Sequence, residues 1–118
     1  IARAIPERVA CTIIFDAPVA RDILPPWDTQ AFYADDAAWQ QDLPLRTLDA
    51  FKAALPEKHL LILISGANFH DEMHTLSEAL GKHGVRHVFL PRPDLKHHWQ
   101  SGWIEAGLDV MRKQGLLP

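Results

Sequence analysis

The sequence has little cysteine, little charge imbalance and no long apolar stretch. Of its 118 residues one is a cysteine, Cys11, so no disulfide can form within the chain. A formal net charge of −3 argues against the broad basic face that binds nucleic acid. No apolar run approaches the roughly 18–20 residues of a membrane-spanning helix. We therefore expect neither a membrane nor a nucleic acid as partner.

The start of the sequence shows no signal-peptide pattern. No basic segment precedes an apolar one as in a signal peptide. The first residue is Ile1 rather than methionine, so we also expect that residues were removed upstream. The length suits one domain over residues 1–118, either whole or as part of a larger domain.

The remaining composition is that of a folded globular protein. Apolar residues make up 47% of the chain and charged residues 23%. Three short, nearly continuous apolar runs occur at residues 8–15, 59–65 and 85–90. Runs of this kind predict strands that are covered on both faces, as in a parallel sheet. A fourth run, residues 30–34, is too short to assign.

Helical spacing of apolar residues appears in three other segments, residues 44–55, 70–84 and 100–114. The apolar stripes consist of Leu45, Leu48, Phe51 and Leu55; of Met73, Leu76 and Leu80; and of Trp103, Ile104, Leu108 and Met111. Strands and helices alternate along the chain. This order predicts a three-layer, Rossmann-like α/β fold, with a mainly parallel sheet and helices on both faces.

An irregular excursion at residues 16–44 interrupts this alternation. It holds four of the nine prolines and two of the four tryptophans. Loops of this length are often functional. Its aromatic residues could line a substrate pocket or could instead pack the excursion against the domain. As substrate-binding residues we predict Trp27, Phe32, Tyr33 and Trp39.

Polar side chains gather directly after the predicted strands, where parallel α/β sheets bind ligands. They are Asp16, Ser65, Asn68, His70, Asp71, Glu72, Asp94, His97 and His98. A carboxylate from one strand end and a histidine from the next could meet across the edge of the sheet. Such a carboxylate orients an imidazole and stabilises its protonated form.

Five segments follow one another in a recognisable order. They read "DAPVARD" (16–22), "WDTQAFYADDAAWQQDLPL" (27–45), "LLILISGANFHDE" (60–72), "LSEALGKHGV" (76–85) and "LPRPDLKHHW" (90–99). Over residues 8–112 the chain resembles the C-terminal half of α/β-hydrolases, especially the esterase and prolyl-peptidase branches. The resemblance implies hydrolysis of ester or peptide bonds by acyl transfer.

Matching that pattern residue by residue implies a catalytic pair. The histidine loop matches at His98, beside Trp99, or at His97, and we prefer His98 as the general base. The orienting acid falls at Asp71. The family's acid usually stands three residues after the glycine, a place that Phe69 takes here. Both residues also have a non-catalytic interpretation: His98 as a solvated loop histidine, and Asp71 as a carboxylate that stabilises the start of a helix.

The nucleophile of that family is not in this sequence. Its serine lies in a G-x-S-x-G turn, and the serines here, Ser65, Ser77 and Ser101, have no such setting. The resemblance therefore implies a serine from outside this chain. It implies no cofactor, and a small ester or peptide as the substrate.

Other functions remain open. "HDEMH" (70–74) places two histidines on one helix face, as in a zinc motif, but Asp71 replaces the glutamate of that motif. Because no third ligand is fixed, we expect no metal. A non-catalytic Rossmann-like or Toprim-like module that binds a protein or nucleic-acid partner is the alternative. Against an active Toprim-like or rhodanese-like enzyme, residues 66–68 carry no acid and Ser65 stands where the cysteine should be.

Overall fold

A three-stranded parallel sheet forms the centre of the molecule. The computed structural model describes residue 5, residues 8–27 and residues 29–118. The strands are β1 (Cys11–Phe15), β2 (Leu60–Ser65) and β3 (His87–Pro91). They lie in the order β1-β2-β3, with Ile13 opposite Ile62 and Ile62 opposite Val88. Every residue of β2 is buried, as the continuous apolar run predicts for a central strand.

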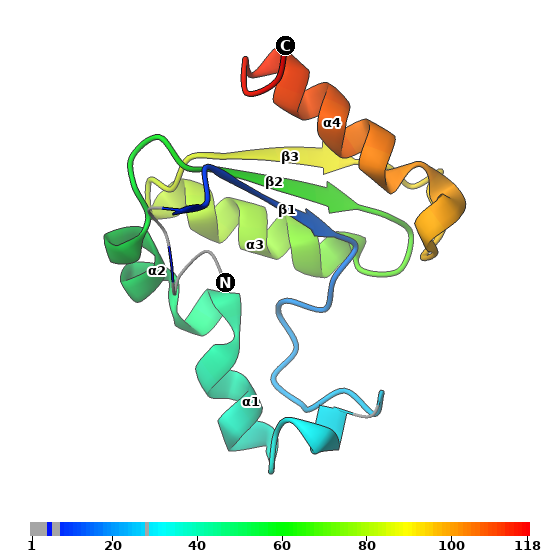
Figure 1. Ribbon diagram of the computed structural model, residues 1–118. Coiled ribbons are helices and arrows are strands. Elements are labelled where there is room, and N and C mark those ends of the chain that lie inside the picture. Colours follow the sequence, from blue (N-terminus) through cyan, green and yellow to red (C-terminus); the bar gives the residue numbers. More distant parts are fainter. Residues whose placement is uncertain (1–4, 6–7, 28) are drawn as a thin grey trace.

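Helices cover both faces of this sheet. They are α1 (Asp36–Asp42), α2 (Leu48–Ala54), α3 (His70–Lys82) and α4 (Trp103–Lys113). Figure 1 shows α3 against one face and α4 against the other. Short 3-10 helices lie at Thr29–Ala31, Pro44–Arg46 and Trp99–Ser101. The three-layer α/β, Rossmann-like architecture predicted from the sequence is confirmed.

Alternate residues of β2 supply two separate hydrophobic cores. Leu61 and Leu63 pack with α2 and α3, whereas Leu60, Ile62 and Ile64 pack with α4. This division follows from the two-residue period of a strand. The two crossovers, through α2 and α3, lie on one face, as right-handed connections between consecutive neighbouring strands require.

The excursion after β1 is more regular than the sequence predicts. It contains α1, whose first turn is capped by Asp35 through a hydrogen bond from the Ala38 amide at 2.9 Å. Its prolines and its lack of an apolar stripe hide this two-turn helix. None of the described helices is both long and apolar enough to cross a bilayer.

Side chains fix the excursion to the rest of the domain. The Arg21 guanidinium binds the Glu72 carboxylate, which also accepts a hydrogen bond from the Ala20 amide at 3.1 Å. The Trp39 indole N–H donates to the Arg21 carbonyl at 2.9 Å. The excursion therefore starts beside α3 and lies away from the sheet, as α1 does in Figure 1.

Candidate active site

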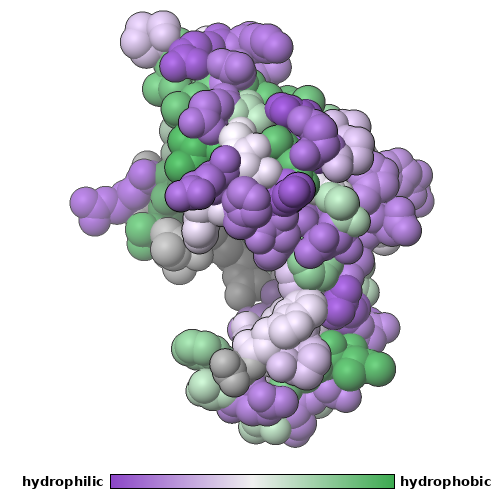
Figure 2. Space-filling view, turned by 90° about the vertical axis from the view of Figure 1, so that its right-hand side faces the viewer, coloured by the Kyte–Doolittle hydropathy of each residue, from purple (hydrophilic) through white to green (hydrophobic). Residues whose placement is uncertain are grey.

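The three strands end at the same side of the sheet, and the polar loops that leave them meet there. Figure 2 views this side: hydrophilic side chains cover much of it, with apolar areas between them. Asp16 follows β1 directly, residues 66–69 follow β2, and the loop of residues 92–98 follows β3. These three loops build the candidate site.

Asp16 is the buried centre of the site. Its side chain is 1% exposed. One carboxylate oxygen, Oδ1, accepts the backbone N–H groups of Gly66 at 2.8 Å and Phe69 at 3.0 Å. The φ angle of Asp16 is +35°, a left-handed conformation that aspartate tolerates better than most residues. Strained backbone of this kind occurs often at functional sites, and here it turns the carboxylate from β1 toward the loop after β2.

His97 completes a carboxylate–imidazole pair. Its Nδ1 lies 3.1 Å from Oδ2 of Asp16, the oxygen that the backbone amides leave open. The ring also packs edge-on against Phe69, with centroids 5.5 Å apart. The His97 side chain is 52% exposed. Because Nδ1 faces Asp16, Nε2 lies on the far side of the ring, where it can accept a proton from a hydroxyl group.

The loop that carries His97 is held by its own neighbours. The Lys96 amide donates to Oγ of Ser101 at 2.6 Å, and the Lys96 carbonyl accepts the Trp103 indole N–H at 2.9 Å. Trp103 is buried. The backbone of Lys96, next to His97, is thus anchored by Ser101 and by the first residue of α4, which restricts where the imidazole can point.

A cavity of about 400 Å³ opens beside the pair. Its lining consists of Phe15, Asp16, His97, His98, Trp99 and Trp103. The volume lies within the range of small-molecule sites, roughly 300–1,000 Å³. A buried carboxylate, a half-exposed imidazole and aromatic walls therefore share one opening.

The pair differs from the one that the sequence resemblance implies. His98 lines the cavity, but Asp71 lies exposed in the first turn of α3 and lines a different, polar depression with residues 67–72. Within the described chain no hydrogen bond joins Asp71 to either histidine of the loop. Asp16 and His97 are both among the polar residues that the sequence places directly after predicted strands. The signal that would have selected Asp16 is its position directly after β1, since its carboxylate can turn back into the sheet rim.

The serines of the chain lie away from His97 or are already bonded. Ser65 is fully buried and contacts Nδ1 of His70 at 3.0 Å. Ser77 contacts His87, and Ser101 holds the Lys96 amide. No described serine is therefore placed to give its hydroxyl proton to His97.

His70 and His74 share one face of α3, as their spacing predicts. Their rings stack with centroids 6.3 Å apart, and both contact the ring of Phe89. Among the described residues no third histidine, cysteine or carboxylate joins them in a cluster that could hold a metal ion.

The four aromatic residues predicted to bind substrate lie outside the cavity at His97. Trp27 is 52% exposed and packs edge-on against Phe69 at 5.8 Å, so one ring separates it from His97. Tyr33 and Trp39 pack edge-on against each other at 5.2 Å. Phe32 is 84% exposed. Tyr33 and Trp39 thus hold the excursion together, whereas Trp27 borders the site indirectly.

Among the described residues, three environments shift pKa values, and all three lie outside the cavity. Burial raises the pKa of the Cys11 thiol, which keeps it protonated and poorly nucleophilic. Burial, and secondly the charge and hydrogen bond of Asp42, raise the pKa of Tyr33. After β3, the hydrogen bond from Arg92 lowers the pKa of Asp94. Arg92 and Asp94 therefore form an exposed ion pair that borders the histidine loop.

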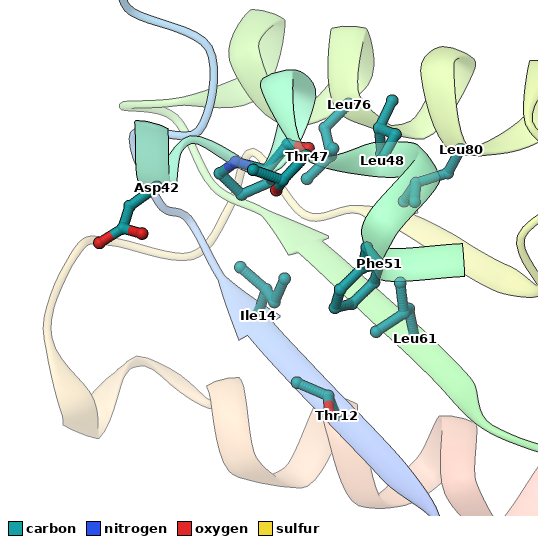
Figure 3. Close-up of a pocket in the computed structure, with 10 residues that line it drawn as sticks. Thr12, Ile14, Asp42, Thr47, Leu48, Phe51, Leu61, Leu76 and Leu80 are labelled. Carbon is teal, nitrogen blue, oxygen red and sulfur yellow. The ribbon is translucent and has the colours of Figure 1, made fainter. Parts of the chain in front are cut away.

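A second, apolar cavity of about 240 Å³ lies on the opposite face of the sheet. Figure 3 shows Ile14 and Leu61 of the sheet facing Leu48 and Phe51 of α2 across it. Asp42 and two threonines are its polar members. Because no histidine lines it and most of its lining side chains are apolar, it is a weaker candidate for chemistry than the cavity at His97.

The chain was compared with family models, curated proteins and solved structures. No family model, no curated protein and no solved structure matches the chain.

Proposed function

We propose that this chain carries the general-base half of a hydrolase that cleaves ester or peptide bonds by acyl transfer. The observation that supports this function best is the contact between the buried Asp16 carboxylate and Nδ1 of the half-exposed His97, beside an open cavity. The order of its segments, which resembles the C-terminal half of α/β-hydrolases, favours the same chemistry.

His97 is the proton carrier in this proposal. Its Nε2 takes the proton of a hydroxyl group while the hydroxyl oxygen attacks the carbonyl carbon of the substrate. Asp16 holds the ring in the tautomer that leaves Nε2 free, and stabilises the imidazolium that forms. The same Nε2 then returns the proton to the leaving group. His97 and Asp16 thus take the roles that the sequence resemblance gives to His98 and Asp71.

The hydroxyl group comes from outside the described serines. In the complete reaction it is a serine of another segment or chain, and in its absence water can serve at a lower rate. We therefore expect slow hydrolysis of activated esters by this chain alone. It needs no metal and no cofactor.

Hydrolysis of p-nitrophenyl acetate tests this proposal. We expect His97→Ala and Asp16→Asn each to lower the rate by about tenfold or more, because positioned general bases typically contribute 10²–10⁴-fold. His83→Ala is the matched control, since His83 pairs with Asp49 at the end of α3, away from the cavity. Its rate should match that of the unchanged chain.

Two outcomes would contradict the assignment. Equal rates for His97→Ala and His83→Ala, with both variants folded by circular dichroism, would remove His97 from the mechanism. A loss confined to His98→Ala would instead favour the base that the sequence resemblance implies. The rates of the four variants therefore separate the two assignments.

One observation favours the alternative of a non-catalytic binding module. The backbone groups of Ala10 and Asp16 bond to β2, so those of Cys11, Ile13 and Phe15 point to the other side of β1. No described strand pairs with that side. An open, uncharged edge can accept an extended segment of a protein partner. If every variant above hydrolyses the ester equally, this alternative is the better account.

A further inference from the structure

We infer that the cavity beside His97 selects an uncharged substrate that carries a flat aromatic group. This inference rests on the proposed hydrolysis for its biological meaning, and on the lining of the cavity for its chemistry. The aromatic group would lie on Trp99 and Trp103, with the carbonyl group directed toward His97.

The floor of the cavity is aromatic and offers no free polar atom. Phe15 and Trp103 pack with centroids 5.9 Å apart at an angle of 49°. The indole N–H of Trp103, its single donor, is already bonded to the Lys96 carbonyl. Trp103 thus presents only its ring to a ligand, and such a surface binds flat apolar groups through offset or edge-on contacts.

The carboxylate of the cavity already has hydrogen-bond partners within the chain. Asp16 is the one carboxylate among the lining residues, and it accepts bonds from Gly66, Phe69 and His97. No lysine or arginine is among those lining residues. An anionic substrate would therefore lose its hydration without gaining a fixed cation, and a cationic one would find no free carboxylate.

Trp99 is the residue that makes this surface specific. It is 77% exposed, although indole is among the most apolar side chains, and it lines the opening next to His98. An indole ring at the opening of a cavity can cover the face of a flat ligand. A ligand ring placed between Trp99 and Trp103 would cover this indole.

Binding of 2-acetonaphthone tests the inference. This neutral ketone has the shape of 2-naphthyl acetate but cannot be hydrolysed. We expect it to shift the indole NMR signals of Trp99 and Trp103 more than those of Trp27 and Trp39. Trp99→Ala should raise the Kd about tenfold or more, which corresponds to about 1.4 kcal/mol. Ile23→Ala removes a comparably exposed side chain, 72%, in the excursion and should leave the Kd unchanged.

A comparison of a charged with an uncharged ligand provides the second test of the inference. The anion 2-naphthoate should bind at least about tenfold more weakly than the ketone, because no lysine or arginine lines the cavity and the His97 ring is already paired with Asp16. Equal affinities for the two compounds, or an unchanged Kd in Trp99→Ala, would overturn the inference. Binding is measured without turnover, so ketone binding with no ester hydrolysis would refute the proposed function alone. Hydrolysis that is indifferent to Trp99 would refute the substrate class alone.

Discussion

At the scale of single residues, the site depends on how one buried carboxylate divides its bonds. Asp16 gives one oxygen to two backbone amides and the other to His97. Buried carboxylates need such partners, because leaving one unpaired costs several kcal/mol. The backbone amides hold the carboxylate in place whether or not the exposed His97 ring moves. The imidazole therefore has a fixed acceptor toward which it can turn.

The single tyrosine of the chain gives a direct measure of a second residue environment. Burial, and then Asp42, raise the pKa of Tyr33 above its ordinary value of about 10. The folded state then holds the phenol proton more tightly than the unfolded state. This contribution to stability is present below about pH 10 and is lost as the pH rises through the raised pKa.

Ultraviolet absorbance of ionised tyrosine tests this environment. We expect the folded chain to titrate at a higher pH than the chain in urea. Asp42→Asn should lower the pKa of Tyr33 part of the way back, while Asp71→Asn on the exposed first turn of α3 should not change it. A folded-state titration that coincides with the unfolded one would show that Tyr33 lies in water.

At the scale of elements, the turn between β2 and α3 controls the site. Gly66 donates its amide to Asp16, and a Cβ atom added there would lie 2.6 Å from Cη2 of Trp103 and 2.9 Å from Oδ2 of Asp16. Both groups are buried and hydrogen-bonded, so neither can yield freely. A glycine at this position thus lets three segments meet: the end of β1, the end of β2 and the start of α4.

Substitution of this glycine tests the close approach. We expect Gly66→Ala to lower the free energy of unfolding by about 1–3 kcal/mol, because overpacking forces buried groups apart. Urea unfolding measures the change. Gly81→Ala in α3 is the control: its added Cβ lies 3.8 Å from His87, and alanine in a helix is favoured by roughly 0.5–1 kcal/mol. An unchanged Gly66→Ala stability would mean that the turn is looser than described.

The sequence predicts the elements better than it predicts the site. Continuous apolar runs locate β2 and β3 within two residues of their ends, and helical spacing locates α3 and α4. The sequence does not predict the helix α1, because this helix buries none of its residues and therefore has no apolar stripe. The sequence does not identify the carboxylate that pairs with His97, because this depends on which of two aspartates turns toward the histidine loop. Asp16 and Asp71 both follow strands, but Asp16 stands directly after β1, and its backbone turns the carboxylate toward the loop after β2.

At the scale of the whole molecule, the proposed chemistry depends on contacts between distant parts of the chain. Asp16 and His97 are 81 positions apart in the sequence. They meet because the three parallel strands end at one edge of the sheet. In addition, α4, which covers the face opposite α3, anchors the histidine loop through Trp103. The site should therefore be lost together with the tertiary fold rather than persist in a partly unfolded chain.

The tautomer of His97 tests the central claim most directly. Two-dimensional ¹H–¹⁵N NMR of the neutral imidazole rings distinguishes the nitrogen that carries the proton, and His98, in the same loop, serves as internal reference. A ring held by Asp16 must carry its proton on Nδ1 and leave Nε2 bare. We predict this tautomer for His97 and the ordinary Nε2–H form for His98. A His97 ring protonated on Nε2 would contradict the pairing with Asp16, and with it the proposed base.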